Sequence, residues 1–198
     1  MHLAKKGIRV LGVAESFAGR RQSTLAGVVM RKDLVIDGVA ATAITVGGND
    51  ATDGVLRLAS LLDRRDINCI MLSGCVIAWY NILSPDRIAE KTGIPVIAVT
   101  YEASEGLEGD IHHHFPGDDE RLCAYRDLGE RTEYSLSTGY RVFLRTAGIP
   151  PEEGALITDA FTHEGRIPEP IRIARLVARA AMQYSEGAGG ANARYRAA

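Results

Sequence analysis

Short apolar runs rich in β-branched residues alternate with polar turns along the first part of the chain. Three of these runs have the length and composition of strands, at residues 7–13, 25–31 and 35–46. The segments between them are short and hold turn-forming or polar residues, which is typical of antiparallel hairpins. The N-terminal part therefore predicts a three-stranded antiparallel sheet.

After residue 46 the pattern changes, and apolar positions recur with helical spacing between short apolar runs. Two helices and two buried strands are predicted in alternation, over residues 53–64, 68–72, 85–91 and 95–100. Thr52 and Ser84 are candidate N-caps of the two helices, and Gly93 is a candidate end of the second. Units of this length join parallel strands by right-handed crossovers, so the sheet is expected to continue with parallel strands.

The chain beyond residue 101 is less regular. Two further strands are expected at residues 131–137 and 140–146, and two helices at residues 152–161 and 169–184. The last 14 residues, 185–198, are rich in Gly, Ala and Arg and predict a flexible tail. Residues 1–184 are therefore expected to form a single domain.

Three antiparallel strands followed by alternating helices and strands is the order of the ribonuclease-H-like fold. We therefore predict an α/β protein with a ribonuclease-H-like mixed sheet, helices on both faces and a C-terminal helix. In that fold the first strand lies centrally, beside the fourth, so the ends of these two strands meet. Ligands of open α/β sheets bind beyond the carboxyl ends of the strands, so function is expected at this edge.

Composition limits the classes of partner. A net charge of −2 over 198 residues argues against a uniformly basic nucleic-acid-binding protein, but it leaves room for a local basic cleft. The cysteines, Cys69, Cys75 and Cys123, fit no zinc-binding spacing and favour a reducing cytoplasm. No apolar run approaches the roughly 20 residues of a transmembrane helix, so no membrane partner is expected.

Three carboxylates are candidates for catalysis. Glu15 follows the first strand, and Asp50 and Asp53 lie in and after the glycine turn that precedes the first helix. Carboxylates that converge from different strands suit Mg²⁺ or Mn²⁺, with Glu15 and Asp50 as metal ligands and Asp53 placed to orient water. The alternatives are a solvent-facing acid for Glu15 and a helix-capping or dipole-compensating acid for Asp53.

Polar and aromatic residues at the same edge are candidates for binding nucleic acid. The candidates are Ser16, Ser73, Gly74, Tyr80 and Asn81. Gly74 permits close approach of a ligand to the backbone, and an aromatic side chain such as Tyr80 can stack on a displaced base. The neighbouring Trp79 is equally consistent with a core position. The run His112 to His114 suggests a surface loop, because three consecutive histidines cannot all face one point in regular structure.

Four segments carry a resemblance to a known family. They are GVAESF at 12–17, TVGGNDATDG at 45–54, the run from Ile70 to Thr100, and PEPIRIARLVARA at 168–180. Together they resemble the archaeal endonuclease dU family, which is related to endonuclease V. The resemblance implies a metal-dependent endonuclease that cleaves DNA at or near deoxyuridine, with DNA containing deaminated bases as its partner and DNA repair as its role.

The chain departs from the endonuclease V pattern at two metal ligands. The aspartate of the first-strand motif G-V-D-V-S-Y corresponds to Ala14, with Glu15 one place later, and the aspartate of a D-G motif corresponds to Ser73. Asp50 is the nearest match to the remaining acid, a glutamate. Because side chains alternate along a strand, Glu15 reaches the cleft faced by residue 14 only if the strand bulges or ends there.

Two hypotheses follow from these departures. Either a metal site is rebuilt from Glu15, Asp50 and Asp53, or the chain is a ribonuclease-H-like protein that binds nucleic acid without cutting it. A small-molecule hydrolase built on the histidine run is a third, which the consecutive placement of the histidines disfavours.

Overall fold

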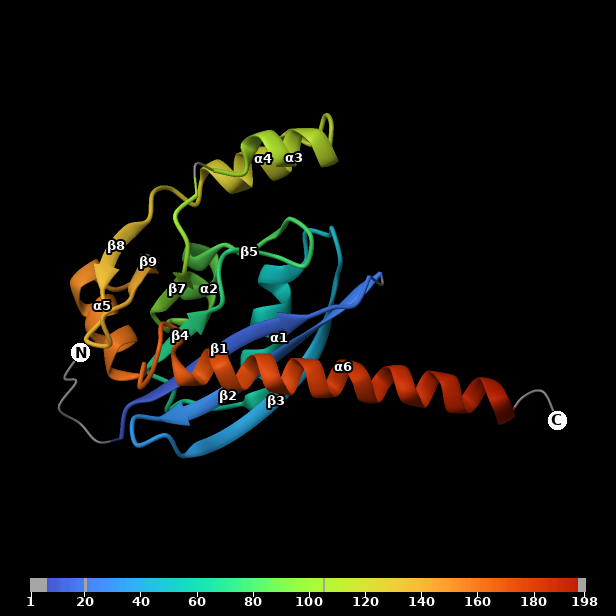
Figure 1. Ribbon diagram of the computed structural model, residues 1–198, viewed down its shortest axis with the longest axis horizontal. Coiled ribbons are helices and arrows are strands. Elements are labelled where there is room, and N and C mark those ends of the chain that lie inside the picture. The colour runs from blue at the N-terminus through green and yellow to red at the C-terminus, as the bar shows by residue number, and fades with distance from the viewer. Residues whose placement is uncertain (1–6, 20, 105, 196–198) are drawn as a thin grey trace.

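A seven-stranded mixed sheet lies at the centre of the molecule, with the strand order β3-β2-β1-β4-β7-β9-β8 (Figure 1). The structure is a computed structural model that describes residues 7–19, 21–104 and 106–195. The strands are β1 (Arg9–Ser16), β2 (Gln22–Arg31), β3 (Ile36–Thr45), β4 (Cys69–Leu72), β7 (Val96–Thr100), β8 (Thr132–Ser135) and β9 (Arg141–Ala147). A separate two-stranded hairpin is formed by β5 (Val76–Ile77) and β6 (Asn81–Ile82).

The pairing directions confirm the predicted fold class. Strands β1, β2 and β3 pair antiparallel, and β1 pairs parallel with β4, which pairs parallel with β7. Strands β9 and β8 then add antiparallel. The first strand therefore lies centrally beside β4, as expected of a ribonuclease-H-like sheet.

Helices cover both faces of the sheet because the strands alternate apolar side chains between two cores. One core joins Val13 and Leu25 to α1 (Ala51–Leu62) and α2 (Pro85–Thr92). The other joins Ala14 to α5 (Pro151–Ala160) and α6 (Glu169–Tyr195). The pair α3 (Glu108–His114) and α4 (Asp119–Arg126) lies at one end of the molecule, away from the sheet (Figure 1).

Several local predictions need correction. Thr52 does not cap α1: it lies in the first turn, where its hydroxyl accepts a hydrogen bond from the Ser84 backbone N–H at 3.0 Å. The histidine run is not a loop but the end of α3. The last helix does not end at residue 184 but continues to Tyr195, and residues 196–198 of the expected tail lie outside the described residues.

The predictions for the two ends of α2 are confirmed. Ser84 caps α2 by accepting from the Arg87 backbone N–H at 3.2 Å, and Gly93 ends the helix in a left-handed conformation. Within the ranges given above, no helix combines the length and the apolar character that crossing a membrane requires.

Helix α6 packs against β1 through a close backbone contact at Gly12. A Cβ atom added at Gly12 would lie 2.3 Å from the carbonyl carbon of Pro170. We therefore expect Gly12→Ala to lower the free energy of unfolding by about 1–3 kcal/mol, because the helix must move away from the strand. Urea denaturation would measure this, with Gly7→Ala as the control, since nothing lies within 4 Å of a Cβ at Gly7. Equal midpoints for the two variants would contradict the expectation.

Candidate functional site

The carboxyl-terminal edge of β1 and β4 brings the candidate residues together but divides them between two faces. Strand β1 pairs with β2 in regular register as far as Ser16, so no bulge turns Glu15 toward the face of Ala14. Ala14 packs in the α6-side core, and the Ser16 hydroxyl lies 3.7 Å from the Met182 sulfur of α6. Glu15 therefore faces the α1 side, opposite Ala14 and Ser16.

Glu15 lies against the β5–β6 hairpin. Its Oε2 accepts a hydrogen bond from the buried Ser23 hydroxyl at 2.5 Å, and its Oε1 lies 3.4 Å from the Ala78 backbone N–H. The second contact is long for a hydrogen bond, so one carboxylate oxygen of Glu15 keeps most of its capacity to accept a proton or a further donor.

Asp50 has a structural role that the sequence did not indicate. Its carboxylate accepts from the Thr45 backbone N–H at 3.0 and 3.1 Å, from the Thr45 hydroxyl at 3.0 Å, and from the Asn81 amide at 2.7 Å. Burial acts to raise the pKa of Asp50, but these hydrogen bonds outweigh burial and hold the pKa below its ordinary value. The carboxylate closes the turn between β3 and α1.

Asn81 is completely buried and uses its amide within the protein. It accepts from the Ala51 backbone N–H at 2.9 Å and donates to the Thr45 carbonyl at 2.8 Å as well as to Asp50. Because every one of these partners belongs to the chain itself, Asn81 positions the hairpin against α1.

Asp53 links two helices at the surface. Its Oδ1 accepts from Arg87 Nη2 of α2 at 2.8 Å, and both side chains are about half exposed. A pair of this kind contributes little to stability, so Arg87 holds Asp53 only weakly.

The expected Mg²⁺ ligands are engaged, wholly or in part, by other groups of the same chain. Among the described residues, no group of three His, Cys, Asp or Glu side chains is arranged to hold a metal ion. The carboxylate of Asp50 already accepts four hydrogen bonds, and that of Asp53 accepts from Arg87. Glu15 and Asp53 keep accepting capacity: Oε1 of Glu15 has its nearest donor at 3.4 Å, and Oδ2 of Asp53 has no hydrogen-bond donor among the described residues.

This arrangement gives an expectation for metal binding. We expect Mg²⁺ in millimolar excess to leave the melting temperature of the protein unchanged in the absence of nucleic acid, because an ion that binds the native state stabilises it by mass action. Differential scanning calorimetry with Mg²⁺ and with EDTA would measure this. A melting temperature that rises with Mg²⁺ concentration would show that the carboxylates rearrange around the ion.

The β5–β6 hairpin has an unusual turn. Ala78, Trp79 and Tyr80 have φ angles of 42°, 62° and 59°, so three consecutive non-glycine residues lie in the left-handed region. This conformation costs an L-residue roughly 1–2 kcal/mol. Such strain persists where surrounding contacts determine the backbone, and it concentrates at functional sites.

Arg121 of α4 supplies those contacts. Its side chain is only 4% exposed and donates to the carbonyl oxygens of Gly47, Gly48 and Tyr80. Asp118 pairs with the same guanidinium at 3.0 Å. The Gly47 backbone N–H also donates to the Ala78 carbonyl at 2.8 Å, so the glycine turn, the hairpin and α4 form one connected unit.

The strained turn presents aromatic side chains. Trp79 is 48% exposed, and its ring lies 5.5 Å from that of Tyr80 and 4.9 Å from that of His114. Phe115 extends this aromatic cluster: its ring lies 6.0 Å from that of Tyr80 and 4.0 Å from the Arg121 guanidinium. Trp79 is therefore exposed and not part of the core, and the histidine run contributes one ring to the cluster.

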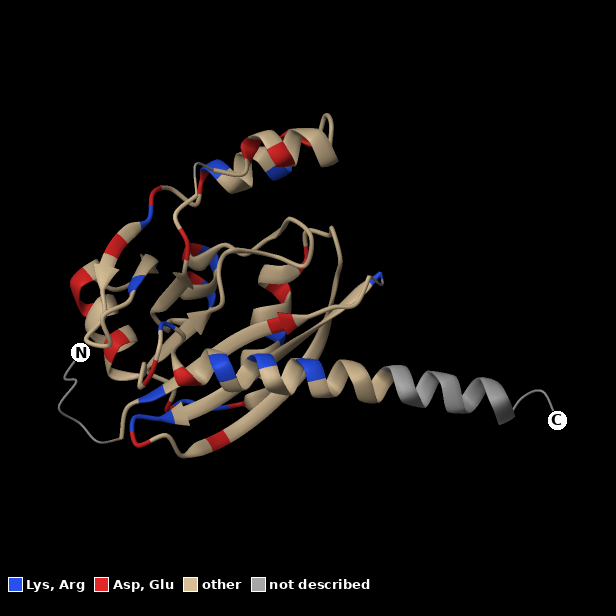
Figure 2. Cartoon of the chain, viewed as in Figure 1, with Lys and Arg blue, Asp and Glu red and all other residues tan. Residues whose placement is uncertain are grey.

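On the α6 face, Ser73 binds an arginine. Its hydroxyl accepts from Nε and Nη2 of Arg175 at 3.2 and 2.6 Å. The backbone N–H of Ser73 donates to the Val13 carbonyl at 3.0 Å, which places Ser73 beside the end of β1. Basic residues recur along α6 where it crosses the sheet (Figure 2). Neither Ser73 nor Arg175 of this pair can supply a carboxylate to a metal.

A pocket of about 370 Å³ opens beside Ser73 and Gly74. Four arginines line it, namely Arg131, Arg145, Arg166 and Arg175. Tyr101 lies in its wall, and burial raises the pKa of Tyr101 to about 12 although Arg175 and Arg166 act to lower it. The phenol is thus neutral, and its hydroxyl has no hydrogen-bond partner among the described residues.

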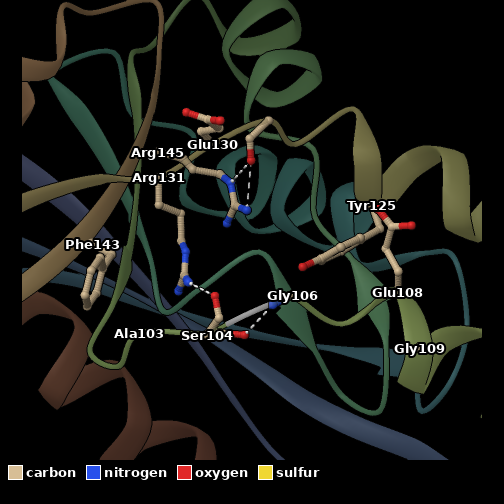
Figure 3. Close-up of a pocket in the computed structure, with 11 residues that line it drawn as sticks. Ala103, Ser104, Gly106, Glu108, Gly109, Tyr125, Glu130, Arg131, Phe143 and Arg145 are labelled. Carbon is tan, nitrogen blue, oxygen red and sulfur yellow. Dashed lines mark hydrogen bonds between the residues drawn. The ribbon is translucent and has the colours of Figure 1, made fainter.

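A second hollow, of about 800 Å³, continues from the first and shares Ser104, Tyr125, Arg131 and Arg145 with it. Figure 3 shows Arg131 reaching toward Ser104, Arg145 next to it, and the Tyr125 side chain entering the hollow from the opposite side. Arg131 donates to the Ser104 carbonyl at 3.1 Å, and Arg145 donates to the Gly129 carbonyl at 3.0 and 3.1 Å. The two hollows adjoin and run from Ser73 to the α3–α4 pair. The pocket beside Ser73 is called the basic groove, because Glu102 is the one acid among the described residues of its lining, whereas Glu108 and Glu130 line the second hollow.

Comparison with known proteins, by a family model and by similar sequences, gives an extensive match in both cases. The family model described as Endonuclease dU matches residues 6–182. The UPF0215 protein of Pyrobaculum calidifontis is 37% identical over 176 residues, which cover 88% of this chain and 97% of that protein. The family-model match therefore includes the hairpin, the basic groove and about the first half of α6.

Solved structures support the fold. A protein of unknown function from Archaeoglobus fulgidus superposes with a TM-score of 0.77 at 28% identity, covering 88% of this chain and 98% of that chain. Endonuclease V of Ciona intestinalis, in complex with a 24mer DNA containing an inosine followed by a ribo-adenosine, superposes with a TM-score of 0.63 at 15% identity. That match covers 90% of this chain and 87% of the other, and it shows a shared fold.

Proposed function

Because the chain belongs to the Endonuclease dU family, we propose that it is an endonuclease that cleaves DNA at or near deoxyuridine, in the repair of deaminated bases. The observation that carries the proposal is the match of that family model across residues 6–182. The nuclease class is also supported by the fold shared with endonuclease V.

The strained hairpin supports recognition of an opened base pair. An enzyme that acts on a base within a duplex must take that base out of the stack. Trp79 and Tyr80 present ring surfaces at a rigid turn, and stacking of a base on an aromatic ring is worth about 1–3 kcal/mol. In the proposal these rings support the displaced base, while Asp50 and Asn81 hold the turn that carries them.

Glu15 is the proposed proton acceptor. It lies beside the turn that carries the rings, and its Oε1, whose nearest donor is the Ala78 N–H at 3.4 Å, can take a proton from an attacking water. The water oxygen then bonds to the phosphorus, the P–O bond to one sugar oxygen breaks, and that sugar oxygen takes a proton from solvent. Ser16, Ser73 and Gly74 lie at the same edge on the other face, where a strand crossing the edge can contact them. The proposal assigns roles to side chains of the chain alone, because the described residues include no group of three His, Cys, Asp or Glu side chains placed to hold an ion.

A strand-break assay tests the proposal. End-labelled duplexes that differ only in one position, deoxyuridine, thymidine or deoxyinosine, would be incubated with the protein in Mg²⁺, in Mn²⁺ and in EDTA. We expect breaks in the deoxyuridine duplex and none in the thymidine duplex. Cleavage of deoxyinosine alone would overturn the substrate assignment, and the EDTA reaction reports whether an ion is required.

A second candidate function is a nucleic-acid-binding protein that does not cut. The observation that favours it is the replacement of two acids of the endonuclease V pattern by Ala14 and Ser73, the second of which is bound by Arg175. Binding of the same duplexes without strand breaks under all three conditions would establish this function in place of the first.

A further inference from the structure

The end of β4 carries a serine–arginine pair. A guanidinium has five N–H donors, and Arg175 uses its Nε–H and one Nη2–H on the Ser73 hydroxyl. Its other N–H groups have no hydrogen-bond partner within the described part of the chain. The pair therefore fixes the position of the guanidinium and leaves donors available for a ligand.

The positive charge of the pocket is largely uncompensated. Arg131, Arg145 and Arg175 form no ion pair with any acid that the structure describes, and their recorded hydrogen bonds go to carbonyl and hydroxyl oxygens. The acid that lines the pocket is Glu102, which is exposed and lies 3.5 Å from Arg166. Several guanidinium groups with one outer carboxylate make a site for an anion.

The ring of Tyr101 supports two of these arginines. The guanidinium carbons of Arg175 and Arg166 lie 5.3 and 5.8 Å from the centre of the ring. Arg166 is also held by the Tyr101 carbonyl, to which its Nη1 donates at 2.8 Å. Both cations are therefore positioned before any ligand arrives, which reduces the entropy lost on binding.

We propose that Arg175, held by Ser73 and supported by Tyr101, binds a backbone phosphodiester of the nucleic-acid strand, with Arg166 and Arg131 completing the site. The proposal rests on the proposed function in so far as the ligand is a nucleic acid. In this proposal the positive charge at the end of β4 comes from an arginine of α6, Arg175. Guanidinium groups bind phosphate oxygens in bidentate geometry, so the site fits a phosphodiester better than an apolar ligand.

Binding measured without cleavage tests this assignment. Fluorescence anisotropy of a labelled deoxyuridine duplex and of its thymidine counterpart would be recorded in EDTA, between about 50 mM and about 200 mM salt. Gel electrophoresis of the same samples would confirm that the duplexes are uncut. For Arg175→Gln we expect binding about fivefold weaker for both duplexes. We also expect the slope of log K against log salt concentration to fall by about 1, as for loss of one phosphate contact.

Arg172→Gln is the matched control. Arg172 lies on the same helix but pairs with Glu169 through Nη2 at 2.6 Å and lines neither hollow. Arg172→Gln should therefore bind like the unaltered protein. Arg166→Gln is the second test variant and should also weaken binding, so the assignment stays testable if Arg175→Gln folds poorly, which circular dichroism would show.

The outcomes separate the assignment from the proposed function. Equal affinity and equal salt slope for Arg175→Gln and Arg172→Gln would overturn the phosphate site, even if the unaltered protein nicks the deoxyuridine duplex. Weaker binding of Arg175→Gln, with no nicking by the unaltered protein, would support the site and remove the proposed endonuclease activity.

Discussion

Replacing Arg121 with methionine is expected to lower the free energy of unfolding by about 3–5 kcal/mol. The substitution keeps an unbranched apolar stem but leaves Asp118 without its cation and the carbonyls of Gly47, Gly48 and Tyr80 without their donor. Each of these groups lies in or next to the strained turn, so the turn loses the contacts that hold its left-handed residues.

The chain contains one tryptophan, Trp79, and it lies in that turn. Urea denaturation of Arg121→Met followed by tryptophan fluorescence and by circular dichroism therefore reports the turn and the whole fold separately. We expect the fluorescence transition of the variant to precede the loss of secondary structure, because the hairpin is released before the sheet unfolds.

Arg126→Met is the control for this prediction. Arg126 lies on the same helix, is 58% exposed, and pairs with Glu108 at 2.7 Å. Surface pairs of this kind contribute about 0–1 kcal/mol, so the variant should unfold close to the unaltered protein. If the two variants had the same midpoint, Arg121 would not be what holds the hairpin.

The sheet could be predicted because its signals are local. Apolar runs and polar turns place the first three strands, and the change to helical spacing places α1 and α2 between buried strands. The ends of α2 were also readable, since Ser84 and Gly93 act through backbone groups within a few residues. Signals of this kind involve residues that are close together in the sequence, so one sequence is enough to detect them.

The site could be predicted only in part, because its contacts are long-range. Tyr80 is separated by 41 residues from Arg121, and Ser73 by 102 from Arg175. No local pattern predicts left-handed residues at Ala78 to Tyr80, which carry side chains that disfavour that conformation. The α4 helix was missed because its buried residue is an arginine, which the apolar periodicity of a helix does not reveal.

The same reasoning explains why the acids looked alike in the sequence. Glu15, Asp50 and Asp53 are all carboxylates near strand or helix ends, and spacing gives no means of ranking them. The fold distinguishes them by their partners: Asp50 is saturated by Thr45 and Asn81, and Asp53 is paired with Arg87. Glu15 differs from Asp53 in lying at the end of β1 against the strained turn, where Ser23 holds one carboxylate oxygen and the nearest donor to the other is at 3.4 Å.

Glu15→Gln is therefore expected to reduce nicking of the deoxyuridine duplex by about 10²–10⁴-fold, the usual contribution of a general acid or base. Glutamine retains an oxygen that can accept from the Ser23 hydroxyl, so the melting temperature and the affinity for the duplex should be preserved. A loss of rate without a loss of binding separates a chemical role for Glu15 from a structural one. Single-turnover nicking and anisotropy on the same preparation would measure both.

Glu133→Gln provides the comparison for Glu15→Gln. Glu133 is also a strand glutamate, but it lies on β8 at the far edge of the sheet and pairs with Arg141 at the surface. The Glu133→Gln variant should nick the deoxyuridine duplex at the rate of the unaltered protein. If Glu15→Gln matched it, the proton acceptor would have to be another group, and Asp53 of α1 and the basic groove of the α6 face would become the places to search. If instead Glu15→Gln lost binding together with rate, the Ser23–Glu15–Ala78 contacts would be acting to hold the hairpin in place.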